Sequence, residues 1–328
     1  MMTAHSPTVL DDEYHEDWRV SEDDPGPLVF LIGCQRSGTT WLLLQLARSG
    51  MFRYLSAYDV YANDRIVHNH RHDLSASERR RFADLLSSAT PNRGIDRIPA
   101  DSATPEEYGL VISDSGVRYD RPDTTAASLP RLRELCAKKA LVEGRSLPLL
   151  LKSPPDYPGA LDLLAQTWPH ARFVAIQRHP LHTLDSQVRA WRQMVVRKNE
   201  YLALIDRGYR ALLDDVAQRI KLGLFLHSEA GVAWLADCIL RAHTGFLDLC
   251  GSWPSGRLLT VRYEDLCGNQ AAEFARISAF LDIAIPAPPE APAPRPSCIG
   301  DDVRRAFAAR RDAFRPFLDR YGYTAESA

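Results

Sequence analysis

One loop constrains the fold of this chain more than any other part of its sequence. Residues 33–40 read Gly-Cys-Gln-Arg-Ser-Gly-Thr-Thr and follow a run of five apolar residues at 28–32. A helical apolar pattern starts directly after the loop and runs over 39–49, with Gly50 as its stop. A buried strand, a loop bounded by glycines and a helix, in this order, predict the first unit of a parallel α/β sheet.

The two glycines of this loop have the G-x4-G spacing of a phosphate-binding loop. Because glycine accepts positive φ, successive backbone N–H groups can point at one anion, and the helix N-terminus adds partial positive charge. The lysine that follows the second glycine in nucleotide triphosphatases is replaced here by Thr39, and the cation lies inside the loop as Arg36. We therefore expect a phosphate-bearing ligand that differs from a magnesium-bound triphosphate.

Three further strands alternate with helices along the chain. The strands are expected at 147–151, 172–177 and 258–263, and the helical patterns that follow them at 159–168, 180–194 and 271–281. Residues 201–250 read as helical throughout, and a last amphipathic helix is expected at 301–321. This alternation predicts an α/β class, a P-loop-like three-layer fold with a central parallel sheet flanked by helices.

The remaining segments divide the chain into a tail and one domain. Residues 1–26 hold eight acids and one arginine between Asp11 and Asp24, which is typical of a tail, so the domain is expected at 27–323. Residues 51–144 show no clear strand. They are expected to form an insertion over the strand ends, where α/β proteins bind ligands. A proline-rich stretch over 283–296 reads as an extended connector.

Composition excludes several classes of function. The formal net charge of −2 gives no basic field for nucleic acid. No apolar run is long enough to cross a membrane and no signal peptide is visible, so we expect a cytoplasmic protein. The six cysteines have no metal-like spacing, and we expect no metal site. The sequence leaves the oligomeric state open, a homodimer included.

A second candidate phosphate site follows the strand at 172–177. Arg178 comes directly after this strand, and Ser186 lies eight residues later on the helix that Pro180 starts. A guanidinium fork and a hydroxyl can hold one phosphate between them.

With both sites in view, the chain resembles the sulfotransferase superfamily, in its bacterial-type branch. Arg36-Ser37-Gly38-Thr39-Thr40-Trp41 looks like the 5′-phosphosulfate loop of that family, and Arg178 with Ser186 looks like its 3′-phosphate site. Lys152-Ser153-Pro154 resembles the lysine motif beside the reacting group. Tyr263-Glu264-Asp265-Leu266 and Tyr321-Gly322-Tyr323 match later segments of the family.

This resemblance implies transfer of a sulfuryl group from 3′-phosphoadenosine-5′-phosphosulfate, without a metal, to a small-molecule or carbohydrate acceptor. It implies that Arg36, Lys152 and the loop hold the 5′-phosphosulfate and stabilise the leaving charge. Trp41 or Tyr263 would contact the adenine, and Arg295 and Ser297 would complete the donor site.

The general base is left open by the sequence. Cytosolic members place a histidine two residues after the lysine, and Pro154 stands there in this chain. Other branches use a carboxylate soon after the first helix, which suggests Asp59 or Asp64. His68, His70 and His72 compete with them, and would share one face if their segment is extended. Two further functions stay open: a P-loop small-molecule kinase, and a nucleotide-binding regulator without turnover.

Overall fold

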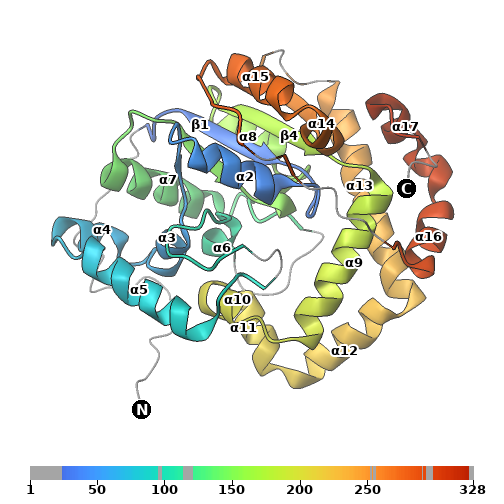
Figure 1. The fold of residues 1–328 in the computed structure, drawn as a ribbon, viewed down its shortest axis with the longest axis horizontal. Helices are drawn as coiled ribbons and strands as arrows, with labels where there is room; N and C mark the ends of the chain where they lie inside the picture. The colour runs from blue at the N-terminus through green and yellow to red at the C-terminus, as the bar shows by residue number, and fades with distance from the viewer. Residues whose placement is uncertain are drawn as a thin grey trace.

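The computed structural model describes residues 24–94, 98–113, 121–251, 253, 256–289, 291–292 and 298–324 (Figure 1). Most of the acidic tail expected at 1–26 therefore lies outside the described residues. Five parallel strands form one sheet in the order β2-β3-β1-β4-β5, which confirms the α/β class. The strands are β1 (Leu28–Ile32), β2 (Arg53–Tyr54), β3 (Leu149–Lys152), β4 (Arg172–Gln177) and β5 (Leu258–Arg262).

Helices fill most of the chain between and after these strands. They are α2 (Thr39–Arg48), α3 (Ala57–Tyr61), α4 (Ile66–Arg71), α5 (Ser75–Ala89), α6 (Gly109–Ile112), α7 (Leu129–Glu143), the 3₁₀ turn η1 (Pro154–Asp156), α8 (Leu161–Thr167), α9 (Pro180–Val196), α10 (Glu200–Ile205), α11 (Arg207–Asp214), α12 (Val216–His227), α13 (Glu229–Cys250), α14 (Tyr263–Gly268), α15 (Gln270–Leu281), α16 (Asp301–Ala308) and α17 (Arg311–Tyr321).

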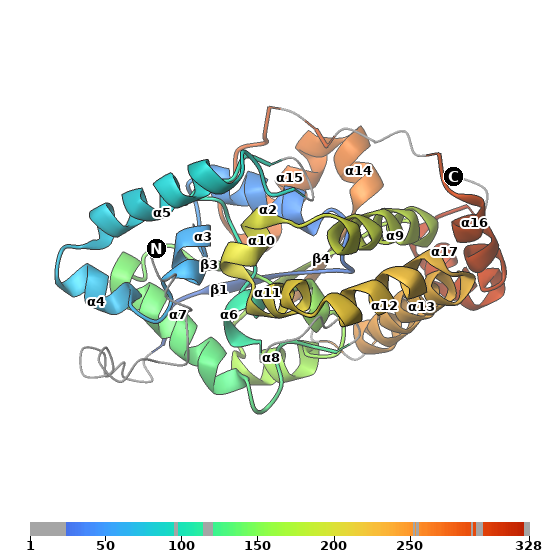
Figure 2. The same ribbon diagram turned by 90° about the horizontal axis from the view of Figure 1, so that it is seen from below.

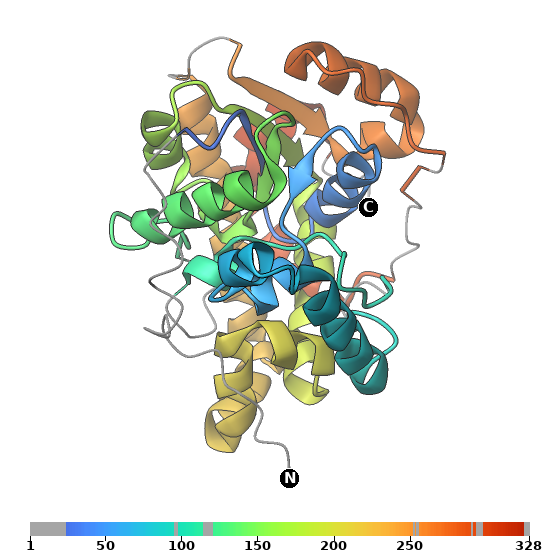
Figure 3. The ribbon, with the colours of Figure 1, turned by 90° about the vertical axis from the view of Figure 1, so that its left-hand side faces the viewer.

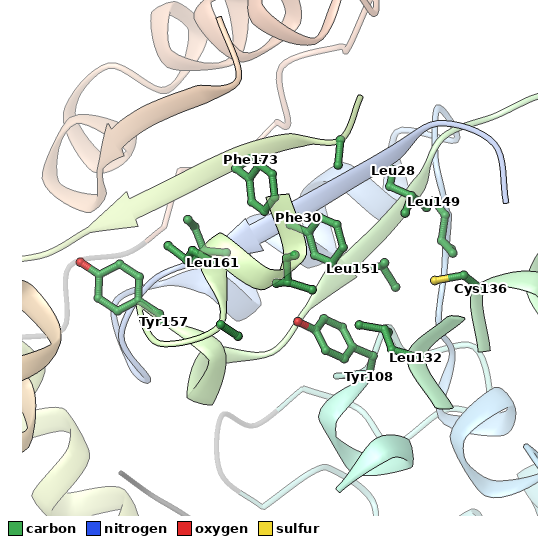
Figure 4. Packing of buried hydrophobic residues seen from close by; sticks show 14 of the residues in the cluster. Leu28, Phe30, Tyr108, Leu132, Cys136, Leu149, Leu151, Tyr157, Leu161 and Phe173 are labelled. Carbon is green, nitrogen blue, oxygen red and sulfur yellow. The ribbon is translucent and has the colours of Figure 1, made fainter. Parts of the chain in front are cut away.

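Strand β1 is buried on both faces, and its side chains alternate between two apolar cores. Phe30 points to the core built with α7, α8 and α13, where its ring stacks on Phe173 with centroids 5.1 Å apart (Figure 4). Val29 and Leu31 point to the opposite core, which they share with α2 and α15. Helices thus cover both faces of the sheet, and the predicted three-layer arrangement is confirmed.

Two groups of helices extend beyond the sheet. Helices α9, α12, α13, α16 and α17 share one apolar cluster, and α3, α5, α10 and α11 share another (Figure 2). Figure 3 shows α5 and the helices α10 to α12, drawn in yellow, on the same side of the sheet. Within the described ranges, no single helix is long and apolar enough to cross a membrane; α12 and α13 meet that test only as a pair bent by 81°.

The structure corrects two sequence expectations. The segment 51–144, expected to lack a strand, contains the two-residue strand β2 at the sheet edge, paired with β3. The last helix, expected as one element over 301–321, is interrupted at Ala309 and Arg310. Arg310 leaves helical geometry and forms a two-pronged ion pair with Asp237 of α13, with N–O distances of 2.5 and 2.8 Å. This contact fixes the bend between α16 and α17.

The strand order explains how distant motifs meet. β1 lies between β3 and β4, and all three strands run in the same direction. The loop after β1, Lys152 at the end of β3 and Arg178 just after β4 therefore project from one edge of the sheet. Tyr263 follows β5 at the same edge.

Candidate active site

The loop between β1 and α2 forms a tight turn that leads directly into the first residues of α2. Arg36 and Gly38 have φ of 69° and 105°, and the N–H of Ser37 donates to the carbonyl of Cys34 at 3.1 Å. The hydroxyl of Ser37 also donates to this carbonyl, at 2.7 Å, and its side chain is buried. The Ser37 side chain therefore holds the turn in place, whereas Thr39 and Thr40 line the cavity described below.

Tyr263 packs directly against this loop. A Cβ added at Gly38 would lie 2.4 Å from Cδ2 of the Tyr263 ring, so only glycine fits here at this backbone conformation. The guanidinium of Arg178 lies 4.6 Å from the centre of the same ring. Tyr263 thus joins the phosphate loop to Arg178, two sites that the sequence analysis treated separately.

Arg178, Arg36 and Ser186 form one hydrogen-bonded chain. Nη1 of Arg178 donates to the backbone carbonyl of Arg36 at 2.9 Å, and Nε of Arg36 donates to Oγ of Ser186 at 3.2 Å. Helix α9 is tied to the loop a second time, since Nε2 of Gln187 donates to the carbonyl of Gln35 at 2.8 Å. The three residues predicted to bind phosphate groups are therefore neighbours.

Arg178 is a partly buried cation that forms no ion pair with the described carboxylates. Burial lowers the pKa of its guanidinium, although Tyr263 and Glu264 oppose this effect. Over the described part of the chain, no carboxylate forms an ion pair with Arg178. The nearby Glu264 instead accepts hydrogen bonds from the N–H of His179 at 3.0 Å and the hydroxyl of Tyr323 at 2.8 Å. A desolvated guanidinium in this position favours binding of an anionic ligand.

Lys152 lies between the loop and a carboxylate. Its side chain is 1% exposed, and its Nζ donates to Oγ1 of Thr40 at 3.0 Å and to Oε1 of Glu107 at 2.6 Å. Glu107 is held in place by its neighbours: the N–H of Tyr108 donates to the carbonyl of Lys152 at 3.1 Å, and the Tyr108 ring packs on Phe30. The sequence analysis did not identify Glu107.

The side chains of Arg36, Lys152, Arg178, Ser186 and Glu107 border one cavity of about 1070 Å³. One part of its wall is the region of the two phosphate sites, and it includes Gln35, Arg36, Gly38, Thr39, Thr40, Trp41, Lys152, Arg178, Ser186, Tyr263 and residues of the proline-rich connector from Pro286 to Pro292. The other part comes from the insertion and from α9–α11. It includes Arg93, Ile98, Glu106, Glu107, Leu110, Ser113, Asp123, Trp191, Met194, Leu202, Asp206, Arg207 and Tyr209.

The second part of the wall mixes apolar side chains with carboxylates. Burial raises the pKa of Asp206; the backbone N–H groups of Tyr209 and Gly208 oppose this rise, and the charges of Glu107 and Asp123 add to it. Asp123 accepts a hydrogen bond from Oγ of Ser153 at 2.6 Å. This part of the wall therefore carries charged groups of both signs, since Arg93 and Arg207 line it beside the carboxylates.

The base candidates taken from the sequence do not line this cavity. Asp59 is 1% exposed; its carboxylate accepts the backbone N–H of Ser56 at 2.8 Å and pairs with Lys139 at 2.7 Å. Asp64 pairs with Arg65 at 3.0 Å. The structure thus gives Asp59 a helix-capping and ion-pairing role outside the cavity.

The three histidines would share one face only if their segment were extended, and the structure shows instead a helix, α4, over Ile66–Arg71. At a helical rotation of about 100° per residue, His70 lies on a different face from its two neighbours. His68 and His72 are one turn apart, with ring centroids separated by 4.3 Å, and His70 is exposed. None of the three lines the cavity.

Two of the predicted donor residues cannot be placed. Arg295 and Ser297 lie outside the described residues. Trp41 borders the cavity, and its ring meets Phe274 edge-on at 6.2 Å. Among the described residues, no group of three or more histidine, cysteine or acidic side chains is arranged to hold a metal ion.

This chain is similar to known proteins both in its sequence pattern and in its fold. A search of curated proteins finds no match. Sulfotransferase STF9 from Mycobacterium avium is similar in structure, with 18% identity, a TM-score of 0.51 and coverage of 97% of this chain and 81% of that one. Sulfotransferase STF1 from Mycobacterium tuberculosis H37Rv has 16% identity, a TM-score of 0.49 and coverage of 94% and 80%. The model of the sulfotransferase family matches residues 27–287. The chain therefore belongs to the sulfotransferase family.

Proposed function

We propose that this protein transfers a sulfuryl group from 3′-phosphoadenosine-5′-phosphosulfate to a hydroxyl group of a small-molecule acceptor. The observation that carries the proposal is the meeting of three cationic side chains at one cavity. Arg36, Lys152 and Arg178 come from the ends of three neighbouring strands, and Arg178 has no carboxylate partner among the described residues. A nucleotide with phosphate groups at the 5′ and 3′ positions of its ribose would give these cations anionic partners.

The donor would occupy the part of the cavity next to the loop. Its 5′-phosphosulfate would meet the backbone N–H groups at the start of α2, with Arg36 and Lys152 beside it. Its 3′-phosphate would meet Arg178 and Ser186. Tyr263, which lies against both sites, and Trp41 are the candidates for contact with the adenine ring.

The chemistry requires stabilisation of charge on the leaving oxygen. In sulfuryl transfer, the acceptor oxygen bonds to sulfur while the bond between sulfur and the bridging oxygen breaks, and the released nucleotide gains a negative charge. Arg36 lies in the loop and Lys152 lies beside it, so their positive charges can stabilise this developing charge. A sulfuryl group carries less charge than a phosphoryl group, and this chemistry does not require a metal.

The acceptor would occupy the part of the cavity between the insertion and α9–α11. Ligand pockets commonly measure about 300–1000 Å³, and this cavity of about 1070 Å³ has room for a nucleotide and a second molecule. Trp191, Leu202 and Leu110 supply apolar surface. Because this wall combines apolar side chains with charged groups of both signs, we propose an acceptor that has an apolar portion and a hydroxyl group.

The first test is calorimetry and thermal shift with adenosine 3′,5′-bisphosphate, run in parallel with magnesium-bound ATP and GTP. The proposal expects the bisphosphate to bind and to raise the melting temperature, and the triphosphates to have little effect. Stabilisation by a triphosphate instead would favour a small-molecule kinase. Binding of the bisphosphate with no donor cleavage would favour a regulator that lacks turnover.

A further inference from the structure

We infer that Glu107 is the general base of this protein and that Lys152 holds its carboxylate until the donor binds. This inference rests on the proposed sulfuryl transfer and concerns the same cavity. It assigns the base to a residue of the insertion, far in sequence from the candidates that the family resemblance suggested.

The contacts of Lys152 place Glu107 next to the phosphate loop. One ammonium group, Nζ of Lys152, contacts both Thr40 of the phosphate loop at 3.0 Å and Glu107 at 2.6 Å. A sulfuryl group held at the loop therefore lies within the reach of both side chains. A base must lie within hydrogen-bond reach of the proton that it accepts, and Glu107 meets this condition for an acceptor that approaches the loop.

The backbone around Glu107 is fixed on both sides. Glu106 is 1% exposed, pairs with Arg93 at 3.2 Å and accepts a hydrogen bond from Tyr201. Tyr108 is buried, and its hydroxyl donates to Asp156. The side chain of Glu107 is 26% exposed and lines the cavity between these two anchors. Its carboxylate is therefore positioned by a rigid segment while remaining open to an acceptor.

The other carboxylates of the cavity wall are engaged elsewhere. Glu106 is held by Arg93, and Asp123 accepts hydrogen bonds from Ser153 and Ser113 at 2.6 and 3.1 Å. Asp206 caps the N-terminus of α11 by accepting the N–H of Tyr209 at 3.0 Å. Among the described residues that line the cavity there is no histidine. Glu107 is the carboxylate in contact with Lys152.

Proton transfer to Glu107 and sulfuryl transfer to the acceptor occur in one step. The acceptor hydroxyl gives its proton to the Glu107 carboxylate while its oxygen bonds to sulfur. The bond from sulfur to the bridging oxygen breaks, and that oxygen leaves with the electron pair on adenosine 3′,5′-bisphosphate. Lys152 turns from Glu107 towards the leaving oxygen, so the charge that neutralised the base in the free protein then stabilises the departing nucleotide. Glu107 later returns the proton to solvent.

The test compares Glu107→Gln with Glu143→Gln. Glu143 is a matched control, because it also pairs with a buried lysine: its Oε1 lies 2.5 Å from Nζ of Lys139, and its side chain is 31% exposed, outside the cavity. Transfer from the donor is measured to 4-nitrophenol, to phenol and to benzyl alcohol, and donor cleavage by water is measured with no acceptor. Bisphosphate affinity is measured by calorimetry for each variant.

We expect E107Q to lower turnover with phenol, benzyl alcohol and water by about 100-fold or more, the usual contribution of a general base. The loss should be much smaller with 4-nitrophenol at alkaline pH, because the ionised acceptor has no proton to give. Bisphosphate affinity should not fall, and E143Q should match the wild type throughout. A residue that only positioned Lys152 would cause the same loss with every acceptor.

Three outcomes would overturn the inference. Wild-type turnover in E107Q would show that another group takes the proton. An equal loss with ionised and neutral acceptors would reduce Glu107 to a positioning residue for Lys152. If the wild-type protein bound no bisphosphate, or bound it and cleaved no donor even with water, the proposed function itself would fail. Binding and donor cleavage measured on the wild type separate that failure from the first two.

Discussion

Replacement of Arg178 by alanine gives the sharpest test of the donor site. In the free protein Arg178 makes one hydrogen bond to the carbonyl of Arg36 at 2.9 Å and lies 4.6 Å from the centre of the Tyr263 ring. Loss of both contacts should cost about 2 kcal/mol of stability. In the complex, loss of a charge-assisted bond to a phosphate costs about 1.5–3 kcal/mol, which is about a 10- to 100-fold change in affinity.

The assay uses two nucleotides that differ only in the 3′-phosphate. Calorimetry with adenosine 3′,5′-bisphosphate and adenosine 5′-monophosphate gives an affinity ratio for each variant. In Arg178→Ala the bisphosphate should lose about 10- to 100-fold in affinity, and the monophosphate should lose little. The ratio therefore reports the 3′-phosphate contact separately from any general loosening of the site.

Arg172 at the start of β4 provides a matched control. It also donates to a backbone carbonyl, that of Phe280 at 2.7 Å, and its guanidinium lies 6.0 Å from the Phe280 ring. Arg172→Ala should lose stability of the same order and bind both nucleotides as the wild type does. An unchanged ratio in Arg178→Ala would refute the assignment of Arg178 to the 3′-phosphate, and a fall in both variants would mean that the effect is one of stability.

Three further predictions concern the cavity and the core. Lys152→Ala should lower the turnover number more than bisphosphate affinity, because its ammonium group stabilises the charge on the leaving oxygen. Steady-state kinetics measures the turnover number, and calorimetry measures the affinity. Asp59→Asn should lower the unfolding free energy by about 3 kcal/mol, because Lys139 loses a buried partner, while the folded fraction keeps its turnover number; denaturant unfolding and active-site titration check this. Burial lowers the pKa of His243 from 6.5 to about 3, so between these pH values the unfolded chain binds a proton that the folded chain does not bind. The unfolding free energy of the wild type, relative to that of His243→Gln, should therefore fall as the pH drops from 6.5 towards 3. Unfolding curves that show no such trend across this pH range would contradict the prediction.

The residues proposed to bind the donor could be singled out from the sequence because their signals are local. The loop at 33–40 carries its glycines, its cation and its flanking strand and helix within a short stretch, and the same is true of Arg178 and Ser186 around Pro180. In each of these two segments, the expected phosphate contacts depend only on the local backbone conformation and on residue types at a fixed spacing. The parallel sheet followed from the alternation of strands and helices, since parallel neighbours need crossover connections.

Which residues of the insertion face the cavity could not be predicted, because this depends on contacts between residues far apart in sequence. Glu107 lies in an acidic, strand-poor segment where nothing in the local pattern separates it from other surface acids. Only the packing of Tyr108 against the core and the end of β3 brings it to Lys152, 45 residues away. In the same way Asp59 reads as a candidate base until the fold places Lys139 beside it.

The sequence by itself thus determined the class of fold and predicted a phosphate-bearing ligand, because a phosphate-binding loop is built from adjacent residues. The tertiary structure decided which carboxylates line the cavity and which are held in ion pairs and helix caps. The physical reason is that the role of a carboxylate depends on its partners and its burial, and both are set by how the insertion packs across the edge of the sheet.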